Sequence, residues 1–304
     1  DGGAEAELRF HLGVIHQRQA EFAGARDELT ASAAQFEQMG DHLRQARALN
    51  RLAFVARLER RFDEASSLVE RAVQLADGDQ GQAAYAHLVR GAIAIDHQAW
   101  EDARGSFDHS RRLWESMGNV RMVAWSRTNT GIALSKLARY DEAIEAYEIA
   151  IDLLSTIQDA LFLATTYNNL GNIYLMTERY ERAAYYYHLA EPIFYRFRDH
   201  SRVASVVTNQ ALTLQKRGLL AEAAELYIHN IEQWRAVGDL KWLVNAMDNL
   251  GETHLAQRNY DAACEVLEEA LAALDRMRDD PEYESLRESL VEHLSLARKG
   301  GSST

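Results

Sequence analysis

The chain has 304 residues, of which 47% are apolar and only two are proline, and 46 acidic against 33 basic residues give a formal net charge of −13. A general nucleic-acid binder needs a basic face, so this balance argues against nucleic acid as the partner. A single cysteine excludes an internal disulfide, and no apolar run approaches the ~20 residues of a membrane span. Good helix formers dominate, so we expect an all-α, cytoplasmic chain that does not enter a membrane.

A small residue recurs along the chain at intervals of 40 residues, with one interval of 38. These residues, which we call anchors, are Gly13, Ala53, Gly91, Gly131, Gly171, Ala211 and Gly251. A bulky apolar residue follows nine positions after each anchor, and alanine follows twelve positions after it. Small residues suit places where two helices cross closely, and we expect the bulky residue to fill the space beside the crossing.

The period predicts seven repeats of two helices each, A and B, joined by turns. In chain order the repeats cover residues 5–41, 42–80, 81–119, 120–159, 160–199, 200–239 and 240–280. Polar junctions such as Gly40-Asp41 and Gly238-Asp239 separate them, since glycine ends a helix in the left-handed conformation and aspartate caps the next one. A capping helix is expected over residues 281–299, opened by Pro281, and a flexible tail over residues 300–304.

Residues 168–174, with the sequence Asn-Asn-Leu-Gly-Asn-Ile-Tyr, followed by Tyr180 and Ala183, resemble the tetratricopeptide family. The resemblance covers nearly the whole chain, although the repeat is longer than the family's usual ~34 residues and lacks its closing proline. The longer repeat is similar to those of spindle-orientation adaptors, kinesin light chains and the sensor arms of bacterial signal-transduction ATPases. The resemblance implies a right-handed α-solenoid whose concave groove, lined by helix A, binds a peptide or protein segment.

Each helix A carries two stripes of residues on opposite faces. One stripe, near anchor positions minus 7, minus 4, minus 1 and plus 3, is expected to face the core. The other, near minus 6, minus 2, plus 1 and plus 5, lines the groove if the resemblance holds; we call it the groove stripe. In repeats two to four it includes Phe54, Val89, Ala92 and Ile132. The candidate ligand-binding residues on or beside this stripe are Arg47, Arg51, Trp125, Asn129, Lys136, Thr165, Asn168, Asn169, Asn172, Asn209, Lys216, Asn245, Asp248, Asn249 and Glu252.

Asparagine stands two positions before the anchor in four successive repeats, at Asn129, Asn169, Asn209 and Asn249. An amide both donates and accepts hydrogen bonds, which suits pairing with a peptide backbone. In the adaptors that the chain resembles, asparagines at this place hold a segment of the partner. The alternative is that each asparagine bonds to the neighbouring helix and shapes the stack. We predict a ligand along repeats four to seven, with Trp125 as an aromatic anchor.

The groove stripe also changes sign along the chain. Arg47, Arg51 and Arg57 lie in repeat two, whereas Asp248 and Glu252 lie in repeat seven. A partner with one acidic and one basic end would fit such a field. The alternative is that these charges only keep an exposed surface solvated.

The sequence holds no phosphate-binding loop, no Gly-x-Ser-x-Gly elbow and no His-Glu-x-x-His helix, so we expect no enzyme activity, no cofactor and no metal site. The leading hypothesis is a protein-interaction scaffold. The alternative is an effector-sensing or regulatory arm of a larger bacterial signalling ATPase or transcriptional regulator. The aromatic segment Tyr185–Phe197 is a candidate homodimer surface, with denser packing inside the repeat as its alternative.

Overall fold

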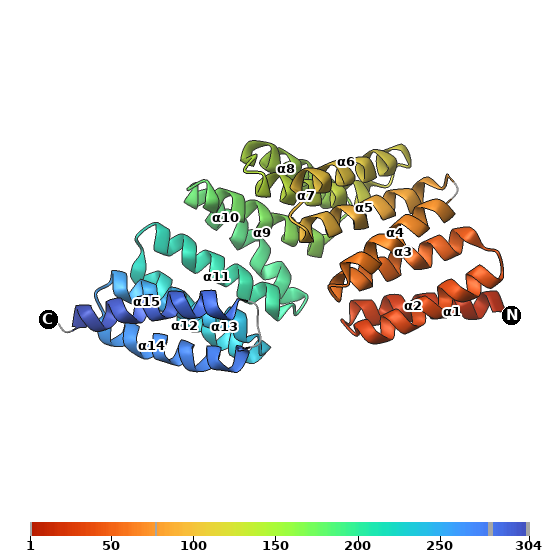
Figure 1. Cartoon of the computed structure of the whole chain (residues 1–304). Helices are drawn as coiled ribbons and strands as arrows, with labels where there is room; N and C mark the ends of the chain where they lie inside the picture. The colour runs from red at the N-terminus through yellow and green to blue at the C-terminus, as the bar shows by residue number, and fades with distance from the viewer. Residues whose placement is uncertain (1, 77, 279–281, 302–304) are drawn as a thin grey trace. The chain divides into compact units, whose positions relative to one another are not determined.

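The computed structural model describes residues 2–76, 78–278 and 282–301 (Figure 1). These residues form fifteen α-helices, one short 3-10 helix (η1, Asp275–Met277) and no strand, so the predicted all-α class is confirmed. The α-helices are α1 (Gly2–Arg18), α2 (Phe22–Gln38), α3 (His42–Leu58), α4 (Phe62–Leu75), α5 (Gln80–Asp96), α6 (Trp100–Ser116), α7 (Val120–Lys136), α8 (Tyr140–Thr156), α9 (Ala160–Met176), α10 (Tyr180–Arg196), α11 (His200–Lys216), α12 (Leu220–Val237), α13 (Leu240–Ala256), α14 (Tyr260–Leu274) and α15 (Tyr283–Gly301).

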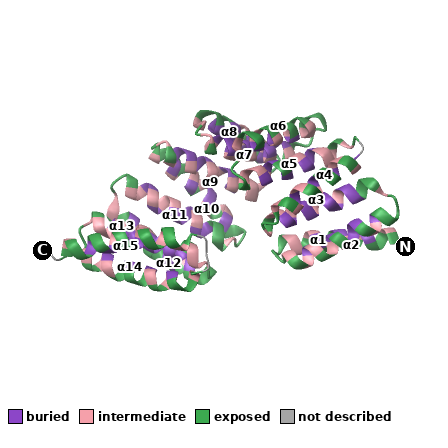
Figure 2. Cartoon of the chain, in the orientation of Figure 1, coloured by how far each residue is buried: buried purple, intermediate pink, exposed green. Residues whose placement is uncertain are grey.

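The helices pair into successive hairpins, from α1 with α2 to α13 with α14, as a helical repeat solenoid requires. They fall into two compact units. The N-terminal unit, residues 1–159, contains four hairpins, and the C-terminal unit, residues 160–304, contains three hairpins and α15. Within each unit the buried residues lie along the sides of the helices that face their neighbours (Figure 2).

A turn with positive φ recurs about every 20 residues, between successive helices. Among the described residues, five glycines and eight other residues adopt φ values between 56° and 83° at these turns. At the junctions Gly40-Asp41 and Gly238-Asp239 the glycine is left-handed, and the aspartate carboxylate accepts a hydrogen bond from the backbone of the next helix. The predicted turn chemistry is therefore confirmed at these places.

The anchors mark where the two helices of a hairpin approach most closely. A Cβ atom on any of the five glycine anchors would lie 2.5–2.7 Å from the side chain sixteen positions later, closer than real Cβ contacts. The five pairs are Gly13 with Leu29, Gly91 with Phe107, Gly131 with Tyr147, Gly171 with Tyr187, and Gly251 with Leu267. Glycine is required here because helix B lays a bulky side chain directly on the backbone of helix A.

This pairing corrects one sequence-based expectation. The bulky residue nine positions after the anchor, such as Phe22 or Tyr140, is the first residue of helix B and is only partly buried. The side chain that fills the crossing lies two turns further along helix B. The expectation was wrong because the residue opposite an anchor depends on where the two helices cross, which a count of residues does not reveal.

Helix α15 occupies the place of an eighth helix A and packs on α13 and α14. Leu290, Leu294 and Ala297 are its buried residues. The predicted start at Pro281 lies outside the described residues. The tail predicted from residue 300 is wrong for its first two residues: Gly300 and Gly301 end α15, and Gly300 packs against the ring of Tyr260.

Replacing Gly171 with alanine should destabilise the chain by about 1–3 kcal/mol, because the added methyl group meets the ring of Tyr187. Urea unfolding of the Gly171→Ala variant measures the change. The matched control is Gly105→Ala: Gly105 is exposed within α6, nothing lies within 4 Å of an added Cβ, and the variant should be more stable by up to about 1 kcal/mol. Equal effects of the two substitutions would contradict the crossing geometry.

Candidate functional site

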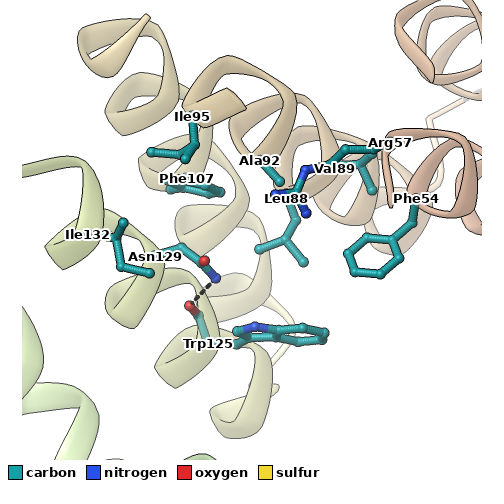
Figure 3. A pocket seen from close by; sticks show the side chains of 10 residues that line it. All are labelled: Phe54, Arg57, Leu88, Val89, Ala92, Ile95, Phe107, Trp125, Asn129 and Ile132. Atoms are coloured by element: carbon teal, nitrogen blue, oxygen red, sulfur yellow. Dashed lines mark hydrogen bonds between the residues drawn. The ribbon is translucent and has the colours of Figure 1, made fainter. Parts of the chain in front are cut away.

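The groove stripe of the N-terminal unit surrounds a pocket with a volume of about 210 Å³ (Figure 3). Three helices A form its walls and one helix B contributes its floor. The lining residues are Phe54 and Arg57 of α3, Leu88, Val89, Ala92 and Ile95 of α5, Phe107 of α6, and Trp125, Asn129 and Ile132 of α7. Apolar side chains dominate this lining, so the pocket suits an apolar group.

Two of the predicted site residues, Trp125 and Asn129, line this pocket, and so do four other members of the groove stripe. Phe107 was not predicted. It belongs to helix B and reaches the pocket because Gly91, against which its ring packs, has no side chain. The signal that finds Phe107 is the bulky residue sixteen positions after every anchor.

The polar groups of the pocket are held by contacts within the unit. Asn129 donates a hydrogen bond from Nδ2 to the carbonyl oxygen of Trp125, one turn earlier on α7 (2.9 Å) (Figure 3). Arg57 forms an ion pair with Asp96 of α5, in which Nη2 and Oδ1 are 3.2 Å apart. These contacts orient the amide and the guanidinium group at the rim, and leave the apolar floor open.

The two arginines of the predicted site on α3 are both placed over aromatic rings. The Arg47 guanidinium lies 4.1 Å from the ring centre of Phe10 and donates to both carboxylate oxygens of Glu7 at 2.6 Å. Its hydrogen bond lowers the pKa of the Glu7 carboxyl below the usual value. The Arg51 guanidinium lies 4.7 Å from the ring centre of Tyr85. Arg47 thus links α3 to α1, and Arg51 links α3 to α5.

In the C-terminal unit, three of the predicted asparagines form one hydrogen-bond network. Asn209 of α11 donates to Oδ1 of Asn172 (3.0 Å) and to Oδ1 of Asn168 (3.3 Å), both on α9. The hydroxyl of Tyr187 also donates to Oδ1 of Asn172 (2.7 Å). Asn209 therefore makes the contact to a neighbouring helix that one of the two sequence-based interpretations expects. Asn129 lies in the other unit and bonds within its own helix.

Three further candidate residues of the C-terminal unit also have partners inside the protein. Thr165 and Asn245 each donate to a backbone carbonyl one turn earlier, those of Leu161 and Lys241. Asp248 accepts from Ser289 (2.8 Å) and contacts Nδ1 of His293 (2.7 Å), so it holds the capping helix α15. Nothing in the sequence marked this role.

Four candidate residues of the C-terminal unit have no hydrogen bond or ion pair from their side chains to the part of the chain that the structure describes. They are Asn169, Lys216, Asn249 and Glu252. All four belong to the groove stripe of the C-terminal unit. Their polar groups are therefore available to an external partner.

The aromatic segment Tyr185–Phe197 divides between core and surface. Tyr187 and Phe194 are buried, whereas Tyr185, Tyr195 and Phe197 are exposed. Tyr195 lines a pocket of about 320 Å³ with His200, Val203 and Val237. Packing inside the repeat accounts for the buried pair, and the exposed rings leave a homodimer contact as an untested prediction.

A second surface of the N-terminal unit contains a pair of histidines. The rings of His87 on α5 and His109 on α6 have centres 4.1 Å apart, in a shallow depression that Arg90 also lines. Burial lowers the pKa of His87 to about 4, and His109 and Arg90 act in the same direction. Within the described ranges, no cluster of three or more histidine, cysteine or acidic side chains is arranged to hold a metal ion.

None of the helices within residues 2–76, 78–278 and 282–301 has both the length and the apolar character that crossing a bilayer requires.

Two tetratricopeptide-repeat family models match the chain, over residues 163–190 and 202–276. No curated protein sequence matches it. Among solved structures, the chain is similar to apo RapI, with 16% identity and a TM-score of 0.68 over 91% of this chain and 100% of that one.

Two further structures share the fold. One is a signal transduction ATPase with numerous domains from Pyrococcus horikoshii, which has a tetratricopeptide repeat sensor: identity is 14% and the TM-score 0.76, over 98% of this chain and 47% of that one. The other is a Rap protein complexed with Competence and Sporulation Factor, with 12% identity and a TM-score of 0.61 over 99% of this chain and 100% of that one. At these identities the likeness concerns the fold.

Alanine substitutions of the asparagines on α9 and α11 should change the free energy of unfolding by different amounts. Replacing Asn209 with alanine removes two hydrogen bonds and should lower the free energy of unfolding by about 1 kcal/mol. Asn169→Ala, in which no described contact is lost, should change it by less than about 0.5 kcal/mol. Thermal unfolding of both variants decides, and equal losses would mean that the network contributes nothing.

His87 should make folding sensitive to acid. The pKa of the His87 side chain is about 4 in the folded chain, against 6.5 for an unperturbed histidine in the unfolded chain. Between pH 4 and pH 6.5 the unfolded state therefore binds a proton at His87 more readily than the folded state does. The stability that His87 contributes is therefore present above pH 6.5 and is lost as the pH falls towards 4. The melting temperature of His87→Gln minus that of the wild type should be more positive at pH 4.5 than at pH 7. An unchanged difference at the two pH values would refute this.

Proposed function

Because the chain is a tetratricopeptide-repeat protein, we propose that it is a scaffold that binds a segment of a protein partner, with an apolar side chain of that segment in the pocket of the N-terminal unit. The family models and the similar folds establish the type of repeat. They leave the partner open, since one fold carries many functions. The proposal therefore depends on the structure of the site itself.

The observation that carries the proposal is the pocket between α3, α5 and α7. Most of its lining residues belong to the groove stripe of α3, α5 and α7. Binding energy at protein interfaces concentrates in a few large side chains that fill such pockets. A volume of about 210 Å³ is below the ~300–1,000 Å³ of pockets that enclose whole small ligands. It suits one anchoring side chain better than an entire effector.

In the C-terminal unit we propose a complementary role for the groove stripe. The side-chain amides of Asn169 and Asn249 are available to pair with the backbone of a bound segment. The charged groups of Lys216 and Glu252 lie on the same stripe. Six other candidate residues shape this surface through the contacts described above, namely Asn168, Asn172, Asn209, Asn245, Thr165 and Asp248. This division assigns binding and structural roles to different members of the predicted set.

The Rap protein of similar fold was crystallised with Competence and Sporulation Factor, which supports a binding role for this architecture. The proposal assigns the chain no catalytic step, cofactor or metal.

A second function is supported by the ATPase with a tetratricopeptide repeat sensor. That match extends over nearly all of this chain but less than half of the ATPase, as expected if the chain serves as a sensor arm. A sensor arm for a small effector would need an enclosed pocket large enough for the whole molecule. The pocket between α3, α5 and α7 is smaller than such a pocket, which favours a scaffold role for this site.

Filling the pocket tests the scaffold proposal. A partner is first captured from the source lysate and identified by mass spectrometry, and its affinity is then measured by calorimetry. Ala92→Leu adds volume inside the pocket and should weaken binding at least about tenfold, because the anchoring side chain no longer fits.

Gly105→Ala on α6, away from the pocket, is the matched control and should bind like the wild type. A partner that binds both variants equally would contradict the site. A metabolite released from the denatured protein, with no protein partner captured, would favour the sensor arm instead.

A further inference from the structure

The three helices that wall the pocket are basic, although the chain as a whole is acidic. Together α3, α5 and α7 contain seven arginines and one lysine but only one acidic residue, Asp96, in a chain with a net charge of −13. The helices A of the C-terminal unit, α9, α11 and α13, contain three basic and two acidic residues. The excess of positive charge is therefore specific to the helices around the pocket.

Two of these cations lie on the groove stripe, each one turn of helix away from a residue that lines the pocket. Arg51 precedes Phe54 by one turn of α3, and Lys136 follows Ile132 by one turn of α7. Neither side chain forms an ion pair or a hydrogen bond with the part of the chain that the structure describes. Two other arginines of α3 are neutralised within the unit, Arg47 by Glu7 and Arg57 by Asp96.

The Arg51 guanidinium is held in place without losing its hydrogen-bonding groups. It lies 4.7 Å from the ring centre of Tyr85, which is itself buried on α5. A ring face attracts the guanidinium plane and leaves the N–H groups at its edge for a carboxylate, which accepts two of them in parallel. Arg51 is thus positioned in advance for an anion beside the pocket.

We propose that the segment bound in this pocket is acidic, with an aspartate or glutamate one or two residues from its apolar anchor on the side of Arg51, and a second acidic residue towards Lys136. This inference rests on the function proposed above. Three residues of helix separate Arg51 from Phe54, about 4.5 Å of rise, and an extended peptide advances about 3.3 Å per residue. A carboxylate one or two residues from the anchor therefore reaches the guanidinium.

The charges contribute selectivity and association rate, and the pocket contributes most of the affinity. Exposed ion pairs are worth up to about 1 kcal/mol each, so removing one cation should weaken binding about two- to fivefold. The effect should shrink at high salt, because exposed charges are screened. The phosphates of single-stranded nucleic acid would also meet these cations, but the apolar lining of the pocket favours a side chain of a peptide.

A displayed library of random dodecapeptides, selected on the whole chain, tests the inference. We expect enriched sequences that combine a large apolar residue with Asp or Glu within two positions of it. Selection on a double variant, Arg51→Glu with Lys136→Glu, should replace the acidic residues with Lys or Arg. Single Gln variants at the same positions should weaken one enriched peptide two- to fivefold. Circular dichroism checks that each variant is folded.

Arg90→Gln is the matched control: Arg90 is also on α5 but lines the depression with the histidine pair, so this variant should bind like the wild type. Enriched apolar sequences without acidic residues would overturn the inference and leave the proposed function standing. Enriched sequences that bind Ala92→Leu unchanged would overturn both. A further outcome is that oligo-dT displaces the peptides, most strongly those with the most acidic residues, and that Ala92→Leu does not change the binding of oligo-dT. This result would assign the cations to nucleic acid and overturn the inference.

Discussion

The close crossing of the two helices in each hairpin is the constraint on which the rest of the structure depends. At Gly91 and Gly171 the backbone of helix A carries no side chain, and an aromatic ring of helix B lies directly upon it. Interiors are packed to the density of organic crystals, so a single methyl group at such a place displaces the ring. The same crossing also supplies groups to the opposite face of helix A. Phe107 passes over Gly91 to the floor of the pocket, and Tyr187 passes over Gly171 to hydrogen-bond Asn172.

The surface for binding is therefore a consequence of how each repeat packs. In the N-terminal unit the groove stripe is apolar where it lines the pocket and carries Arg51 and Lys136 one turn away, and Asn129 and Arg57 are the polar residues of the lining. In the C-terminal unit the groove stripe is rich in amides, several of which satisfy one another. Apolar pockets contribute affinity and charged rims contribute selectivity, so the two units offer different chemistry to a partner.

Much of the fold was predictable from the sequence, because the 40-residue period and the alternation of small and bulky residues determine which faces of the helices must be buried. The all-α class, the hairpins and the turn chemistry at Gly40-Asp41 follow from local rules. The side chain that packs on each anchor could not be predicted in this way, since Tyr187 lies opposite Gly171 only because the two helices cross there. The groove stripe identified Trp125 and Asn129. The contacts of Asn209 and of Asp248 with neighbouring helices depend on side-chain positions across helices, which one-dimensional spacing does not contain.

The central claim is that the pocket between α3, α5 and α7 accepts an apolar side chain of the partner. A crystal structure of the chain bound to its captured partner, or to the partner segment that retains the affinity, tests this most directly. The account predicts an apolar side chain in contact with Phe54, Val89 and Ile132, with the ring of Phe107 beneath it. A partner bound elsewhere on the chain, with no group in contact with these four side chains, would contradict it.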